Sequence, residues 1–198
     1  MRSVFFVSGL MMVASVAYAQ EQSCTYALDK NTVTVGWTGF KTTQKTGVNG
    51  TFKKVEVKGK LEAKTFADLM KGLKVSVDKM AIDSGNPVRD TSLTEAFFGK
   101  LKNSISGKIK SVSEDDRSLI LALDFNGKTK DVPMHYEVKE DKLFSATGNI
   151  DVLDFGAKSA LSSLNERCHD LHKGADGVSK TWSEAAINLK GTITKSCK

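Results

Sequence analysis

The sequence predicts a single domain built mainly from antiparallel β-strands. Apolar and polar residues alternate with a period of two along most of the chain, which is typical of strands with one buried and one solvated face. The turns between these segments have hairpin length, and Asn126-Gly127 is a strong turn signal. The chain has only two prolines and contains no internal repeat or low-complexity linker. About eight to ten strands at this regular spacing indicate an antiparallel barrel or sandwich.

The first 19 residues have the layout of a secretory signal peptide. Arg2 precedes an apolar run over residues 4–16, and an A-x-A cleavage site ends at Ala19. The run is shorter than the roughly 20 apolar residues that a membrane span needs, and no later stretch comes close. We therefore expect cleavage after Ala19, a mature domain of residues 20–198, and an exported protein without stable membrane insertion.

The charge balance is mildly basic. Removing residues 1–19 takes away one of the 29 basic side chains and none of the 23 acidic ones, which leaves a net charge of +5. The lysines are scattered along the chain, whereas a nucleic-acid-binding face needs a basic stripe with stacking aromatic residues. We therefore predict no nucleic-acid partner.

Eight stretches alternate clearly enough to predict strands. They cover residues 32–38, 52–57, 73–77, 105–109, 119–125, 132–138, 144–152 and 187–193. At the second stretch, in the segment VNGTFKKVEVKG, Gly50 and Lys53-Lys54 indicate a bulge or a change of register. Asn126-Gly127 joins the fifth stretch to the sixth, and residues 140–142 turn the chain into the seventh.

One face of these strands is apolar, and we predict that it lines the interior. The inward residues are Val33, Val35, Trp37, Val75, Val77, Leu121, Leu123, Phe125, Met134, Tyr136, Phe144 and Ile150. The same alternation fits a packed core and an open lumen equally well, because large aromatic residues and methionine occur in both.

Helical spacing appears in residues 65–72, 91–101 and 153–174. Asn86-Pro87 stands before the second segment and suits the N-cap and first helical positions, where the missing donor of proline costs nothing. The third segment carries one apolar stripe with a 4-3-4-3 spacing, so we expect an amphipathic helix near 154–172 that covers a barrel end.

The three cysteines all lie in the expected mature chain, in a compartment where disulfides persist. Cys24 precedes the first predicted strand and Cys197 ends the last one. If these strands are antiparallel neighbours, the two positions meet, so we predict a Cys24–Cys197 disulfide. Cys168 is then either a buried thiol or a linking one. A homodimer has only the base rate of two-fold oligomers in its favour.

No catalytic or metal-binding motif is evident in the sequence. His169 and His172 could share a helix face, but the CHDLH motif lacks a spaced further ligand, and imidazoles near a helix end are favoured by the dipole alone. The chain contains no G-x-S-x-G elbow, P-loop or dinucleotide fingerprint. We therefore predict a protein that is not an enzyme, with no metal site and no cofactor.

Charged residues crowd into the segment DSGNPVRDTSLTE. As an acid–base site it would need carboxylates that face a cleft with pKa values pushed apart. The structural alternative is that Asp83 and Asn86 cap a turn while Arg89 forks onto a carboxylate such as Asp90 or Glu95. We favour the structural role.

This segment also resembles a family signature. SVDKMAIDSGNPVRDTSLTEAFF is similar to the YceI-like family, in which a strand leads into a D-[ST]-G-N-x-x-R-D loop and a short helix. Near the start, Gly47, Val48, Gly50 and Phe52 match the family's G-[VT]-x-G-x-F turn. The resemblance covers roughly residues 24–152.

The resemblance implies an extended lipocalin-like antiparallel β-barrel of about eight strands. A short helix follows the D-S-G-N-x-x-R-D loop, and the longer helix is expected near 154–172. Family members resemble exported carriers that hold a long isoprenoid, quinone or fatty-acyl amphiphile. Two departures concern the ligand mouth: Gly148-Asn149-Ile150 is not followed by the family's T-x-H-G-V-T element, and Asn31 stands near the place of its usual histidine.

Together these patterns predict a periplasmic carrier that binds a long-chain amphiphilic lipid, with a stress-related role as one option. The inward residues above form the predicted lumen, with Phe97 and Phe98 closing it, and Asp83, Asn86, Arg89 and Asp90 form the predicted rim. Two alternatives stay open. One is a secreted hydrolase or isomerase that uses Asp83, Arg89 and Asp90, and the other is a packed-core interaction protein without a ligand.

Overall fold

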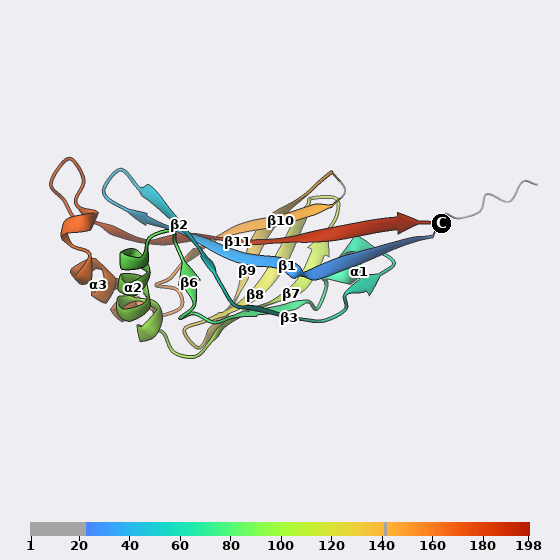
Figure 1. The fold of residues 1–198 in the computed structure, drawn as a ribbon, viewed down its shortest axis with the longest axis horizontal. Coiled ribbons are helices and arrows are strands. Elements are labelled where there is room, and N and C mark those ends of the chain that lie inside the picture. Colours follow the sequence, from blue (N-terminus) through green and yellow to red (C-terminus); the bar gives the residue numbers. More distant parts are fainter. Residues whose placement is uncertain (1–22, 141) are drawn as a thin grey trace, which may run out of the picture.

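A computed structural model describes residues 23–140 and 142–198, so the predicted signal peptide lies outside the described residues. Within them, eleven strands form one antiparallel sheet that curls into an elongated half-barrel (Figure 1). The helices α2 and α3 lie together at one end of the molecule, and α1 lies toward the other end. The predicted all-β architecture with a few short helices is confirmed.

The strands cover most of each predicted stretch and extend several of them, while residues 53–54, Leu73 and Val152 lie outside the strands. Their bounds are β1 (Cys24–Lys41), β2 (Thr46–Phe52), β3 (Val55–Lys58), β4 (Glu62–Ala63), β5 (Lys74–Val77), β6 (Ile82–Asp83), β7 (Ile105–Ser113), β8 (Ser118–Phe125), β9 (Lys128–Lys139), β10 (Leu143–Asp151) and β11 (Thr181–Cys197). The helices are α1 (Phe66–Met70), α2 (Pro87–Ala96) and α3 (Lys158–Arg167), with 3-10 turns η1 (Phe98–Lys100) and η2 (Asp170–His172). The two shortest strands, β4 and β6, carry no alternation long enough to be recognised in the sequence.

The sheet order explains how the half-barrel closes. Strands follow one another as β3-β5-β7-β8-β9-β10-β11-β1-β2-β6, with β4 paired to β1. β2 pairs with β1, whereas the next segment, β3, pairs with β5 at the opposite end of this order. Residues 53–54 therefore lead from β2, the strand next to the edge strand β6, to β3 at the opposite edge of the sheet. The bulge or register change predicted there is instead a complete change of partner strand.

The predicted turns and helix starts follow from backbone chemistry. Asn126 and Gly127 both have positive φ, of 54° and 74°, as a tight hairpin turn requires. Asn86 caps α2, because its Oδ1 accepts hydrogen bonds from the backbone N–H groups of Val88 and Arg89, both at 3.1 Å. The helix therefore begins at Pro87, as predicted from Asn86-Pro87, although helical spacing was recognised only from Thr91 onward.

Both longer predicted helices are shorter in the structure. α2 ends at Ala96, and the chain tightens into η1 where the helix was expected to continue to Leu101. The expected helix near 154–172 is divided into α3 and η2. Gly156 has φ of +70°, which is outside the right-handed helical region, so the helix cannot begin before it.

The half of the barrel beside α1 is filled. Phe66 of α1 packs against Tyr136 and Phe144, with ring centroids 4.9 and 5.9 Å apart. Leu69 and Met70 are almost completely buried in the same core. Here the sequence pattern corresponds to a packed interior.

The predicted Cys24–Cys197 disulfide is present. It joins the outer ends of β1 and β11, which are antiparallel neighbours with these two residues in register. Cys168 is free and buried, so its thiol does not offer a surface link between two copies. The described part of the chain contains no helix that is long and apolar enough to cross a membrane.

Candidate ligand-binding cavity

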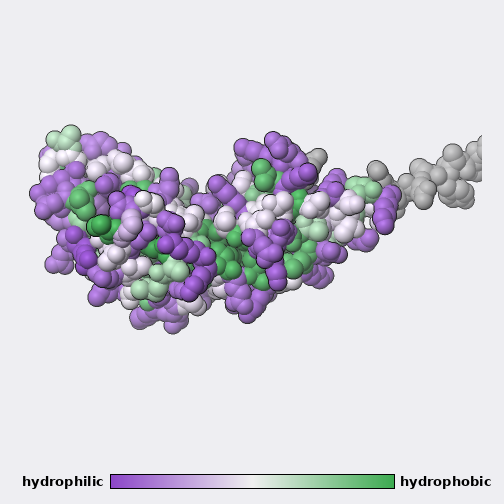
Figure 2. All heavy atoms as spheres, viewed as in Figure 1, coloured by the Kyte–Doolittle hydropathy of each residue, from purple (hydrophilic) through white to green (hydrophobic). Residues whose placement is uncertain are grey.

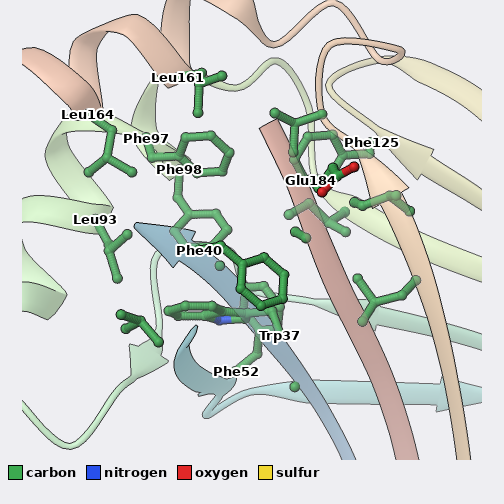
Figure 3. A pocket seen from close by; sticks show the side chains of 18 of the residues that line it. Trp37, Phe40, Phe52, Leu93, Phe97, Phe98, Phe125, Leu161, Leu164 and Glu184 are labelled. Atoms are coloured by element: carbon green, nitrogen blue, oxygen red, sulfur yellow. The ribbon is translucent and has the colours of Figure 1, made fainter. Parts of the chain in front are cut away.

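The half of the barrel beside α2 and α3 is hollow. A cavity of about 450 Å³ lies between the curled sheet and the segments α2, η1 and α3 (Figure 3). Its volume falls within the range of roughly 300–1,000 Å³ that is usual for small-molecule sites. The walls are mainly aliphatic and aromatic, and Phe97, Phe98, Leu93, Leu161 and Leu164 close the helical side.

The structure places eleven of the fourteen predicted lumen residues on this cavity. They are Val35, Trp37, Val75, Val77, Phe97, Phe98, Leu121, Leu123, Phe125, Met134 and Ile150. The other three, Val33, Tyr136 and Phe144, do not line it. Tyr136 and Phe144 pack against Phe66 of α1. Val33 packs toward Gly191, the residue paired with Phe144.

The Phe97-Phe98 pair and the segment near 154–172 lie on the same side of the cavity. The sequence suggested that they would close the barrel ends, but α2 contacts α3 directly, and α3 contacts η1. An ion pair of 2.9 Å between Arg167 Nη2 and Glu95 Oε2 also links α3 to α2. These segments therefore form one cover, and the far end is closed by α1.

A tight aromatic contact forms the wall at β1 and β2. The ring of Phe98 lies 6.1 Å from Trp37 and 5.5 Å from Phe52, measured between centroids. A Cβ atom at Gly50 would lie only 2.1 Å from the indole of Trp37, so glycine is needed for the ring to lie against β2. Gly50, the second glycine of the G-[VT]-x-G-x-F turn, thus shapes the cavity wall.

Gly39 leaves part of the cavity open. A Cβ atom added to this residue would have no other atom within 4 Å, and its backbone is not in the left-handed region. Its partners in the sheet, Val48 and Ala185, both line the cavity, so this side of Gly39 faces the interior. Gly39 was not among the predicted lumen residues, although the inward series of Val35 and Trp37 continues to it.

Exposed apolar side chains mark the opening of the cavity. Val88 of α2 is 75% exposed and Leu171 of η2 is 67% exposed, yet both line the cavity. The opening therefore lies beside α2 and η2, at the end of the molecule opposite the disulfide (Figure 1). Elsewhere, hydrophobic residues also gather at the middle of the molecule near β3, and hydrophobic and hydrophilic residues are mixed at the end formed by α2 and α3 (Figure 2).

The predicted rim residues are divided between two surfaces. Asn86 and Arg89 line the cavity, whereas Asp83 and Asp90 line a shallow depression on the outer side of the loop, which Asn86 also borders. Asp83 Oδ1 accepts a hydrogen bond from the N–H of Gly85 at 2.9 Å, as expected for a turn cap.

Arg89 does not fork onto a carboxylate as predicted. Its Nε donates to Ser84 Oγ at 2.9 Å, and its Nη2 donates to the Ser84 carbonyl oxygen at 3.2 Å. Ser84 in turn donates from its backbone N–H and its hydroxyl to Asp90 Oδ1, at 2.9 and 2.6 Å. Ser84 stands between the two charged side chains, and Glu95 is engaged with Arg167.

Replacing Arg89 with alanine is expected to destabilise the protein by about 1–2 kcal/mol, because two hydrogen bonds from a charged donor are lost. For a domain of this size, this corresponds to a fall in Tm of roughly 3–6 °C. Binding of farnesol should change less than about threefold, because apolar contacts dominate the cavity. Thermal unfolding and farnesol titration measure both quantities.

Arg167→Ala is the matched control for Arg89. It removes a half-exposed ion pair, for which we expect a loss below about 1 kcal/mol. If Arg89→Ala left Tm unchanged but removed binding, the structural role assigned to Arg89 would be wrong.

A polar corner lies at the cavity opening. Lys41 Nζ donates to the Leu171 carbonyl oxygen at 3.0 Å, and His172 Nδ1 lies 2.6 Å from Thr181 Oγ1. Burial, followed by the positive charge of Lys41, lowers the pKa of His172 below its ordinary value. Burial raises the pKa of the Cys168 thiol. Near neutral pH both side chains are therefore uncharged, and Lys41 carries the charge of this corner.

The two histidines of the CHDLH motif have separate partners. His169 is exposed and its Nδ1 lies 3.2 Å from Asp170 Oδ1, whereas His172 contacts Thr181 in the cavity wall. Residues 23–140 and 142–198 contain no group of three or more side chains placed to hold a metal ion.

Comparison with known proteins identifies the family. The profile of the YceI-like domain matches residues 26–190. The chain belongs to the YceI-like family. The resemblance seen in the D-S-G-N-x-x-R-D loop and the G-[VT]-x-G-x-F turn is thereby confirmed, and it extends through most of the described chain.

Two solved structures share the fold of this YceI-like protein. A polyisoprenoid-binding domain from Saccharophagus degradans, implicated in plant cell wall breakdown, matches with a TM-score of 0.57 and 10% identity over 85% of this chain and 97% of that one. Burkholderia cenocepacia BcnA matches with a TM-score of 0.56 and 14% identity over 84% and 99%. A search of curated proteins found no significant match.

Proposed function

We propose that this YceI-like protein is a periplasmic carrier for a long-chain amphiphilic lipid, such as an isoprenoid, a quinone or a fatty-acyl derivative. The observation that carries the proposal is the apolar cavity of about 450 Å³ with an opening beside Val88 and Leu171. Each buried methylene of a ligand contributes about 0.8 kcal/mol, so a long chain binds there without a specific polar contact. The polyisoprenoid binding described for the Saccharophagus degradans domain supports the same class of ligand.

The periplasmic location rests on two features. Residues 1–19 have the pattern of a signal peptide, and the Cys24–Cys197 disulfide suits an oxidising compartment.

We propose that the protein is not an enzyme and needs no cofactor. Asp83 and Asp90, the carboxylates of the alternative catalytic site, bind their own loop and do not line the cavity. The alternative of a packed core without a ligand conflicts with the hollow half of the barrel.

Native mass spectrometry followed by denaturing mass spectrometry tests the carrier function. The full chain, exported to a bacterial periplasm so that the disulfide forms, is expected to carry a mass in the lipid range that extracts into organic solvent. The extracted species identifies the cargo. A protein that stays free of ligand after incubation with farnesol, palmitoleic acid and total membrane lipids would contradict the proposed function.

A further inference from the structure

Lys41 is a partly buried lysine with no acidic partner. It is the last residue of β1 and lines the cavity, in the same inward series as Val35, Trp37 and Gly39. Within the described residues, no carboxylate oxygen lies within 4.0 Å of its Nζ, and its one polar contact is the Leu171 carbonyl oxygen at 3.0 Å. An ammonium group has three donors, so two remain available.

The other charged groups around the cavity do not offset Lys41. Among the described residues that line the cavity, Glu184 is the one carboxylate, and it forms an ion pair with Lys45. Arg89 adds a second cation to the wall, and its hydrogen bonds go to Ser84, which is neutral. The cavity is therefore apolar along its length and positively charged near its opening.

This distribution of charge has a chemical consequence for the ligand. A cation that is partly removed from water beside an apolar cavity is stabilised by an anion, and hydrogen bonds between charged groups are about twice as strong as neutral ones. A neutral head group would leave Lys41 without such a partner. A carboxylate or phosphate would accept its two free N–H donors while the apolar chain of the ligand filled the cavity.

We propose that the cavity selects amphiphiles with an anionic head group, carboxylate or phosphate, and that Lys41 binds this head group at the opening. The inference rests on the proposed lipid-carrier function and adds the charge class of the ligand. The competing explanation is that Lys41 only caps the carbonyl end of η2 through Leu171, which would affect stability but not ligand preference.

Three probes that share one apolar chain separate these explanations: farnesol, farnesoic acid and farnesyl monophosphate. Their affinities are measured by displacement of the neutral fluorophore N-phenyl-1-naphthylamine, with every probe below its micelle concentration. The wild type is expected to bind at least one anionic probe about tenfold more tightly than farnesol. The stronger of the two anions identifies the head group as a carboxylate or a phosphate.

Three lysine variants complete the test. Lys41→Met is expected to lower the affinity for the preferred anionic probe about 10- to 100-fold and the affinity for farnesol less than about threefold. Lys41→Arg keeps the charge and should retain the preference. Lys190→Met removes the same charge from an exposed position on β11 away from the cavity, and should leave all three affinities within about twofold.

The outcomes distinguish this inference from the function on which it rests. Equal affinities of the wild type for the three probes would overturn the head-group assignment but leave the carrier function standing. The head-group assignment is also overturned if Lys41→Met lowers Tm without changing the preference for the anionic probe over farnesol. The same conclusion follows if Lys190→Met reduces that preference as much as Lys41→Met does. If none of the three probes binds the wild type, the inference fails, and the carrier function fails with it if the protein also stays free of palmitoleic acid and membrane lipids in the mass-spectrometry test.

Discussion

Replacing Gly39 with phenylalanine is expected to weaken farnesol binding at least about 100-fold while the protein remains folded. The position has open space on its cavity side, so the new ring would occupy the volume that the proposed ligand needs. A hundredfold loss corresponds to about 2.7 kcal/mol, which equals the contribution of only three or four methylene contacts. Titration with farnesol in the fluorophore-displacement assay measures the loss.

The stability of Gly39→Phe should be at least that of the wild type. Gly39 has an ordinary strand backbone, and glycine is unfavourable within a strand compared with an aromatic residue. The expected result is therefore an unchanged or higher Tm together with lost binding. Such a combination is difficult to attribute to misfolding, because a partly unfolded protein would have a lower Tm as well as a lower farnesol affinity.

Two further variants control the Gly39 experiment. Thr34→Phe adds the same ring to an exposed position on the same strand, and should leave farnesol affinity within about twofold. Gly39→Ala adds a single methyl group and should have an intermediate effect. Unchanged affinity in Gly39→Phe would show that the ligand does not occupy this cavity, even if the protein binds lipid elsewhere.

The direction of each inward side chain could be predicted from the sequence, because it follows from the period of the strand. Val35 and Val77 are placed as the alternation indicated. Whether such a residue meets another side chain or empty space depends on distant segments. Tyr136 and Phe144 are packed because α1, some 70 residues earlier, inserts Phe66 between them and the interior. Local periodicity contains no information on that contact.

Polar residues of the site were harder to recognise. Lys41 stands at the end of a strand, where a lysine normally indicates a solvated position, and its place in the cavity wall depends on the pairing of β1 with β11. Arg89 was predicted to pair with a carboxylate, but it lies in the first turn of α2 and donates to Ser84 instead. The carboxylates nearest in sequence suggested an ion pair, whereas Ser84 is the residue that the loop places against the guanidinium group.

Removing the disulfide by Cys24→Ser is expected to lower the free energy of unfolding by about 3–5 kcal/mol. The bridge joins residues 173 positions apart, and closing a loop of that length gives roughly 5 kcal/mol in the chain-entropy account of disulfides. The loss in practice is smaller where the unfolded chain keeps residual structure. Denaturant unfolding of the wild type with and without a reducing agent, alongside the variant, measures it.

The position of the disulfide separates its effect from that of the cavity. Cys24 and Cys197 lie at the outer ends of β1 and β11, while the cavity opening lies at the other end of these strands (Figure 1). Cys24→Ser should therefore keep farnesol affinity within about threefold under conditions where it is folded. Cys168→Ser is the control, since its thiol is free, and it should leave the sensitivity of unfolding to reducing agent unchanged. Equal stability of the oxidised and reduced wild type would show that the pairing of β1 with β11 alone holds the two chain ends together.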